Sequence, residues 1–135
     1  MAGIGSVRDG LKARLATITG LYTYDTVPGS VNVPAAIVGM PSSIRFDVVF
    51  RSAVTRMQFP VRLLVGQAHE AEAQDRIDEY ISADGASSVR AAIDGDGTLG
   101  GVAHTTRVVE VRDVGVYEVA GVAYLGADVL VEVIA

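Results

Sequence analysis

The segment Met57-Gln-Phe-Pro-Val-Arg-Leu-Leu-Val65 has the clearest structural pattern in the chain. Its odd-numbered positions are all apolar, whereas the even-numbered ones are more varied, and this period of two is typical of a strand with one side toward a core. The preceding segment, Ile44-Arg-Phe-Asp-Val-Val-Phe50, alternates in the same way. We therefore expect two strands of one sheet, with the apolar side of each facing a core.

A short polar connection separates these strands. It reads Arg51-Ser-Ala-Val-Thr-Arg56, which is polar enough to lie in solvent. The simplest arrangement is a long antiparallel hairpin with this connection as its tip. The tip would then carry the positive charges of Arg51 and Arg56.

The C-terminal third of the chain is predicted to be strand throughout. The valine-rich segments are 107–114, 116–119 and 122–134, separated at Gly115 and at Ala120-Gly121. If Ala120-Gly121 is a two-residue turn, Tyr117 faces Tyr124 across the ladder, a pairing that stabilises sheets. The sequence leaves the type and register of that turn open.

The N-terminal region has helical periodicity. Apolar side chains recur at three- and four-residue spacing, at Ile4, Val7, Leu11, Leu15 and Ile18. This spacing predicts an amphipathic helix over about residues 6–19, with Ser6 as N-cap and Gly20 as stop signal. In residues 31–38, Pro34 favours an edge strand or an irregular extended segment.

A second amphipathic pattern lies in the middle of the chain. One helical arc holds Ala73, Ile77, Tyr80 and Ile81, and the opposite arc holds Asp75, Asp78 and Glu79. This pattern predicts a helix that lies on a sheet. A shorter helix is expected from Ser87 or Ser88 through Ile93, before a glycine-rich turn at 94–101.

These elements predict one α+β domain over residues 1–135. We expect a mostly antiparallel (mixed) β-sheet with a long hairpin, flanked on one face by the N-terminal helix and the central acidic helix. A chain of 135 residues is long enough to bury a core without disulfides or metal.

The composition limits the function classes. Cysteine is absent, which excludes thiol catalysis, thiolate metal sites and a disulfide framework. The N-terminus lacks the basic start and apolar run of a signal peptide, and no segment approaches the roughly 20 apolar residues of a membrane helix. We expect a soluble protein without a membrane partner.

The net charge of −5 is unevenly distributed. Between Glu70 and Asp96 there are eight acidic residues but only Arg76 and Arg90 as basic ones, so one face is expected to be acidic. Such a face disfavours phosphate binding, and therefore a specific nucleic-acid reader. Ten of the eleven basic residues are arginine, which fits either a GC-rich genome or a need for planar contacts at interfaces.

The motifs that could carry chemistry are weak. Asp94-Gly-Asp-Gly-Thr98 is similar to the first half of a calcium loop but lacks the closing glutamate, so a tight acidic turn is the favoured interpretation. His69 and His104 are far apart and have no second histidine at metal-ligand spacing. The glycines at 95–101 lack the lysine and hydroxyl of a phosphate-binding loop. We expect no catalytic residues, no metal and no cofactor.

The remaining candidates are interface residues. The acidic residues Glu70, Glu72, Asp75, Asp78 and Glu79 form either a solvated helix face or a docking surface for a basic partner. Arg51 and Arg56 have the opposite charge. Contact between these two surfaces on neighbouring copies would be head-to-tail, the kind that closes into a ring when the rotation is right.

Several segments resemble tail terminator proteins of long-tailed phages that infect actinobacteria. They are Val7-Arg-Asp-Gly-Leu-Lys-Ala-Arg-Leu15, Tyr24-Asp-Thr-Val-Pro-Gly-Ser-Val-Asn-Val-Pro-Ala-Ala-Ile-Val38, Phe59-Pro-Val-Arg-Leu-Leu-Val-Gly66, Ala73-Gln-Asp-Arg76, Gly115-Val-Tyr117 and Tyr124-Leu-Gly126. The resemblance covers nearly the whole chain, and its motifs are structural rather than catalytic.

This resemblance implies a hexameric ring on the head-proximal end of the tail tube. The ring would stop tube polymerisation, bind the tail tube protein and the head-completion or neck proteins, and let double-stranded DNA pass through its lumen without specific binding. The protein would be assembled in the host cytoplasm and located at the tail–neck junction of the virion.

Two alternatives stay open. One is another head–tail joining or tail-completion protein, which would differ in the partner that it caps. The other is a small monomeric enzyme or ligand-binding module, which would need a pocket with convergent polar groups.

Overall fold

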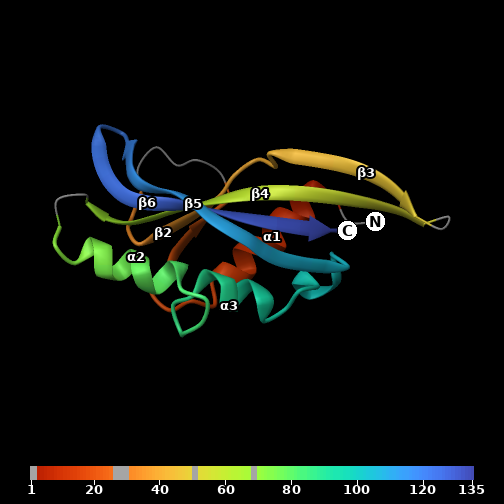
Figure 1. Cartoon of the computed structure of the whole chain (residues 1–135), viewed down its shortest axis with the longest axis horizontal. Coiled ribbons are helices and arrows are strands. Elements are labelled where there is room, and N and C mark those ends of the chain that lie inside the picture. The colour runs from red at the N-terminus through yellow and green to blue at the C-terminus, as the bar shows by residue number, and fades with distance from the viewer. Residues whose placement is uncertain (1–2, 26–30, 50–51, 68–69) are drawn as a thin grey trace.

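The computed structural model describes residues 3–25, 31–49, 52–67 and 70–135. Within these residues, three helices cover one face of a six-stranded sheet (Figure 1). The elements in chain order are α1 (Ile4–Leu15), β1 (Tyr22–Tyr24), β2 (Ala35–Val38), β3 (Ser43–Val49), β4 (Ser52–Gln67), α2 (Ala73–Ile81), α3 (Val89–Asp94), the 3-10 turn η1 (Leu99–Gly101), β5 (Thr105–Val119) and β6 (Val122–Ile134). This arrangement confirms the predicted α+β class.

The sheet is built around β4. The strand order is β1-β2-β4-β6-β5, and β3 pairs with the first half of β4 on the side where β2 pairs with the second half. Strand β6 runs along the other side of β4, from Arg56 to Gln67. The pairings are antiparallel except that of β1 with β2, so the sheet is mixed but mostly antiparallel, as predicted.

The core lies between the sheet and the helices. Odd-numbered side chains of β4 face it, and Phe59, Val61 and Leu63 are fully buried. The helices contribute the buried side chains Val7, Leu11 and Leu15 from α1, and Ala73, Ile77 and Tyr80 from α2. The period of two thus predicts the buried face of β4 correctly, because the helices cover this part of the sheet.

Pro60 lies inside this central strand, where a missing N–H would ordinarily disrupt the ladder. The Pro60 carbonyl accepts a hydrogen bond from the backbone N–H of Gly39 at 3.3 Å, so the polar side of this residue faces β2 and β3 rather than β6. Pairing with β3 runs up to Gln58 and pairing with β2 begins at Val61. The missing donor therefore falls in the interval between two partner strands.

The tip of the hairpin differs from the prediction. Because β4 begins at Ser52, Arg56 lies within the strand, opposite Arg45 of β3, and not in a polar loop. Thr55 exchanges two backbone hydrogen bonds with Ala135, at 2.8 and 2.9 Å. The polar composition misled the prediction, since a β-branched residue such as Thr55 fits a paired strand well. Arg51 lies outside the described residues.

Helix α1 begins and ends earlier than predicted. Gly3 occupies the N-cap position, so Ser6 lies inside the helix and is not its cap. After Leu15 the chain turns but still returns Ile18 to the core, at 3% exposure, which explains why the apolar period continues past the helix. The three-residue strand β1 was not predicted, because so short an element leaves no periodicity.

Strand β5 is continuous across Gly115 and is not two strands. Its register shifts twice, and at the second shift Asp113 has a φ of 54° and its carbonyl accepts a hydrogen bond of 2.6 Å from the Tyr117 hydroxyl. These bulges bend the β5–β6 hairpin away from the rest of the sheet (Figure 1). Tyr117 pairs with Tyr124 across the two-residue turn, as predicted.

Candidate functional site

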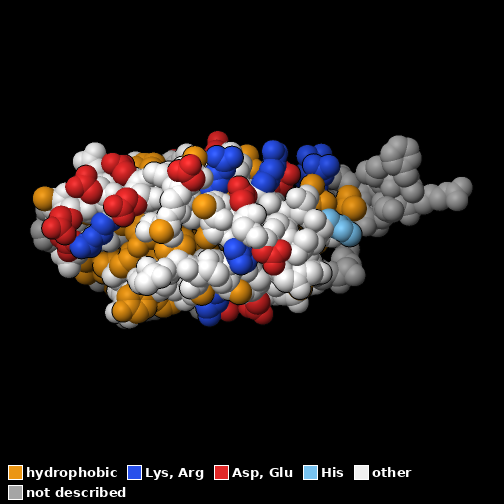
Figure 2. Space-filling view, turned by 90° about the horizontal axis from the view of Figure 1, so that it is seen from below, with side chains coloured by type: hydrophobic (Ala, Val, Ile, Leu, Met, Phe, Trp, Pro, Cys, Tyr) orange, Lys and Arg blue, Asp and Glu red, His pale blue; other side chains and the backbone are white. Residues whose placement is uncertain are grey.

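The acidic surface lies at one end of the molecule, over α2. Figure 2 shows acidic side chains gathered at this end around a basic one. All five predicted residues are exposed there: Glu70, Glu72, Asp75, Asp78 and Glu79. They face outward because the opposite side of α2 packs against the sheet. The structure therefore brings together the acidic half of the predicted interface.

One guanidinium partly neutralises this acidic surface. Arg76 Nη1 lies 3.7 Å from Glu70 Oε2, and Arg76 Nη2 lies 3.3 Å from Glu72 Oε2. Because these side chains are largely exposed, each pair contributes at most about 1 kcal/mol to stability. Beneath the surface, burial raises the pKa of Tyr80, and the charge of Glu79 acts in the same direction. The remaining carboxylates present negative charge to solvent.

A groove lies beside the acidic surface, between α2 and the bent β5–β6 hairpin. We call it the α2 groove; its volume is about 440 Å³ and its lining is Glu70, Ala71, Gln74, Ile77, Asp78, Val114, Gly115 and Leu125. Its exposed carboxylates make the groove acidic, while Val114 and Leu125 give it an apolar floor. Val114 is 53% exposed, and Val116, the cross-strand partner of Leu125, is 64% exposed.

The opposite end of the molecule is the projecting part of the β3–β4 hairpin (Figure 1). Phe46 on β3 is 81% exposed there, although its alternation predicted a core side chain. Its cross-strand partner is Thr55, a small side chain, and the hairpin projects beyond the helices that bury the central sheet (Figure 1). Arg45 and Arg56 lie opposite each other on the other face of this hairpin.

The most ordered polar cluster lies on the face of the sheet away from the helices. Arg62 donates hydrogen bonds from Nε and Nη2 to the two oxygens of Asp128, at 3.0 and 3.3 Å. The guanidinium carbon lies 4.3 Å from the ring centre of Tyr117. The hydrogen bond that Arg62 donates to Asp128 raises the pKa of Arg62, and burial raises the pKa of Tyr117.

An adjacent pocket of about 220 Å³ is lined by Ile37, Gly39, Pro60, Arg62, Val119 and Asp128. Its two charged groups bind each other, which leaves a mostly apolar cavity. This arrangement holds the bent hairpin against the sheet and offers no group that is arranged as a nucleophile or a general base.

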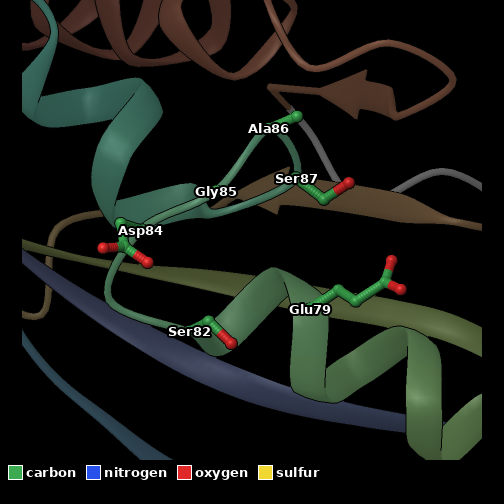
Figure 3. A pocket seen from close by; sticks show the side chains of 6 residues that line it. All are labelled: Glu79, Ser82, Asp84, Gly85, Ala86 and Ser87. Carbon is green, nitrogen blue, oxygen red and sulfur yellow. The ribbon is translucent and has the colours of Figure 1, made fainter.

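A second pocket, of about 280 Å³, lies in the turn after α2 (Figure 3). The carboxylates of Glu79 and Asp84 lie on opposite sides of it and do not converge (Figure 3). Ser82 and Ser88 are engaged locally: Ser82 Oγ donates to the Asp78 carbonyl at 2.5 Å, and Ser88 Oγ donates to the Ser82 carbonyl at 2.6 Å. This pocket is part of the loop's own packing.

The loop at 94–98 is the tight acidic turn that the sequence favoured. The Asp96 carboxylate accepts hydrogen bonds from Thr98 Oγ1 at 2.6 Å, Thr98 N at 3.1 Å and Gly100 N at 2.9 Å. These bonds, that from the Thr98 hydroxyl above all, lower the pKa of Asp96. Among the described residues, no three metal-ligating side chains converge. His104 is exposed just before β5, and His69 lies outside the described residues.

Neither a protein-family model nor a curated protein matches this chain. No helix in the described part of the chain is long and apolar enough to cross a membrane.

Sequence reasoning missed the exposed apolar residues Phe46, Val114 and Val116. The alternation predicts a core position for Phe46, and the sequence predicts only strand at Val114 and Val116. One signal for Phe46 is present in the sequence: its cross-strand neighbour, Thr55, is too small to bury an aromatic ring. For Val114 and Val116 the exposure depends on the bulges, which leave no comparable signal.

Proposed function

We propose that this protein is a virion structural protein: a tail terminator that forms a ring on the head-proximal end of a phage tail tube, stops tube polymerisation and joins the tail to the head–neck complex. The sequence resemblance to that family supports the proposal, since the similar segments fall in α1, β2, β4, α2 and the β5–β6 hairpin. The ring size that the resemblance implies is six.

The observation that carries the proposal is the placement of unlike surfaces at opposite ends of an elongated subunit. The acidic surface over α2 lies at one end, and the projecting hairpin with Arg45 and Arg56 lies at the other (Figure 1). Contact between unlike surfaces is heterologous, so each copy has one surface of each kind to offer, and a suitable rotation between copies closes a ring.

The partners follow from this position in the tail. One face of the ring would bind the tail tube protein, and the other would bind the head-completion proteins. Double-stranded DNA would pass through the lumen without specific binding, and any carboxylates that line the lumen would repel its phosphates.

A tube-polymerisation assay tests the function. Tail tube protein is allowed to polymerise with and without this chain, and tube lengths are measured by negative-stain electron microscopy. We expect short tubes that carry a ring at one end. Tubes of unchanged length without a ring would overturn the proposal, and binding to a neck protein without any effect on tubes would favour the other class of head–tail joining protein.

A further inference from the structure

We propose that the α2 groove receives the projecting β3–β4 hairpin of a second copy of this chain, with Phe46 as the anchor side chain. The inference rests on the proposed function in taking a second copy as the occupant. It goes beyond attraction between charges, because it assigns an apolar contact between Phe46 of one copy and the α2 groove of another.

Phe46 is suited to be an anchor. It is 81% exposed on a strand whose register with β4 is regular, so the backbone that carries this side chain is ordered without a partner. Ile44, at 36% exposure, lies two residues away on the same face of the hairpin. Large aromatic side chains that enter a pocket carry much of the binding energy at interfaces, and an ordered strand loses little entropy on binding.

The α2 groove offers a matching surface. Val114 on its floor is 53% exposed, and the neighbouring Val116 is 64% exposed, so a single subunit leaves an apolar strip uncovered between α2 and β5. Its volume of about 440 Å³ is large enough to enclose an aromatic ring together with part of the strand that carries it.

The charges around the two halves are complementary. Glu70 and Asp78 line the groove, and Glu72, Asp75 and Glu79 extend the negative surface along α2. On the hairpin, Arg45 and Arg56 lie on the face opposite Phe46. With Phe46 inserted, the long side chain of Arg45, which is exposed, would extend past the edge of the hairpin toward the carboxylates. An arginine-bearing hairpin is therefore favoured over an acidic or neutral partner segment.

The groove and the hairpin lie at opposite ends of the molecule, so one copy cannot satisfy its own groove (Figure 1). In a ring of copies, the hairpin of the next copy occupies every groove. In a reciprocal dimer, the hairpin of each copy would occupy the groove of the other copy through the same contact. The size of the oligomer thus tests the ring, whereas the identity of the contact is tested by variants.

Complementation between two variants tests the contact. Phe46→Asp removes the anchor, and Val114→Asp places a charge on the groove floor; both positions are exposed, so the fold should survive, which circular dichroism checks. Tyr22→Asp, at an exposed aromatic residue on β1, is the matched control. We expect each interface variant to weaken self-association at least about tenfold in sedimentation equilibrium, and the control to behave as wild type.

An equimolar mixture of the two interface variants should form a one-to-one pair and nothing larger. In that pair the intact hairpin of one variant enters the intact groove of the other, and the second contact is blocked. Wild-type association by Phe46→Asp, failure of the mixture to pair, or a wild-type chain that stays monomeric at about 1 mM would each overturn the inference.

The same variants separate this inference from the proposed function. If Phe46→Asp shortens tubes and forms rings as wild type does, the contact is wrong and the function stands. If the mixture pairs as expected but wild type leaves tube length unchanged, the contact stands and the tail-terminator function is wrong.

Discussion

Phe59 and Phe46 lie on neighbouring strands of one sheet, and the same alternation predicts a buried side chain at both positions. Phe59 is fully buried, whereas Phe46 is 81% exposed. The two residues project from the same face of the sheet, but Phe59 packs in the core beneath the helices, whereas Phe46 belongs to a hairpin that projects beyond the described helices (Figure 1). A period of two therefore indicates a strand and which side chains share a face. Whether that face is buried depends on another layer that covers it.

The largest difference between covered and uncovered positions should be seen in matched truncations. Phe59→Ala leaves a cavity in the core and is expected to lower the free energy of unfolding by about 3–5 kcal/mol. Phe46→Ala removes a ring that mostly contacts solvent and should change it by no more than about 0.5 kcal/mol. Urea denaturation of both variants measures this; equal losses would mean that the assigned facing of the hairpin is wrong.

A pair of cross-strand glycines gives the next largest contrast. A methyl group at Gly126 would overlap the Leu63 carbonyl and crowd Leu64 and Tyr117, whereas one at its partner Gly115 would meet no atom of the described structure within 4 Å. We expect Gly126→Ala to cost about 1–3 kcal/mol through overpacking between β4 and β5. Gly115→Ala is the control and should be close to neutral. Thermal unfolding of both variants measures the difference.

Charge at the uncovered end should affect assembly rather than folding. Arg45→Gln removes one of two facing guanidinium groups on the hairpin, so we expect self-association to weaken several-fold and to depend less on salt, with thermal stability nearly unchanged. Arg107→Gln is the control, because Arg107 lies on β5 and belongs neither to the β3–β4 hairpin nor to the lining of the α2 groove. Equal effects of the two variants would indicate a general charge effect and no specific contact.

The smallest effect concerns the covered side of α2. Because burial raises the pKa of Tyr80 in the folded chain, the folded state disfavours the phenolate. The contribution of Tyr80 to the free energy of unfolding is therefore fully present below the usual tyrosine pKa of about 10, and it is lost as the pH rises above that value. Tyr80→Phe should lose less stability than wild type between pH 9 and about 11, and Tyr22→Phe, at an exposed tyrosine, should follow wild type. Identical profiles for all three chains would contradict the assigned burial.

The sequence predicts much of the fold because its local signals agree with one another. The period of two in residues 57–65, the helical arc of Ala73, Ile77 and Tyr80, and the turn at Ala120-Gly121 each correspond to an observed element. The predicted exposure of Asp75, Asp78 and Glu79 is also confirmed, since a helix that packs one side on a sheet must expose the other. Their role in an interface stays a prediction.

The parts that were wrong depend on contacts distant in sequence. The polarity of residues 51–56 predicts a loop, but residues 52–56 lie in β4, where Ala135 pairs with Thr55 and extends the ladder. The α2 groove lies beside β5 next to its register shift at residues 112–115. In the proposed assembly, a second copy covers Phe46. The local sequence pattern predicts neither the pairing of Ala135 with Thr55 nor the groove beside β5.

The central claim is that the two uncovered ends assemble copies of this chain into a closed ring. Sedimentation velocity of the purified chain, alone and mixed with tail tube protein, tests it most directly. We expect one discrete oligomer of fixed mass, which forms alone or on the tube and does not grow further as the concentration rises. A chain that sediments as a monomer in both samples would contradict the claim.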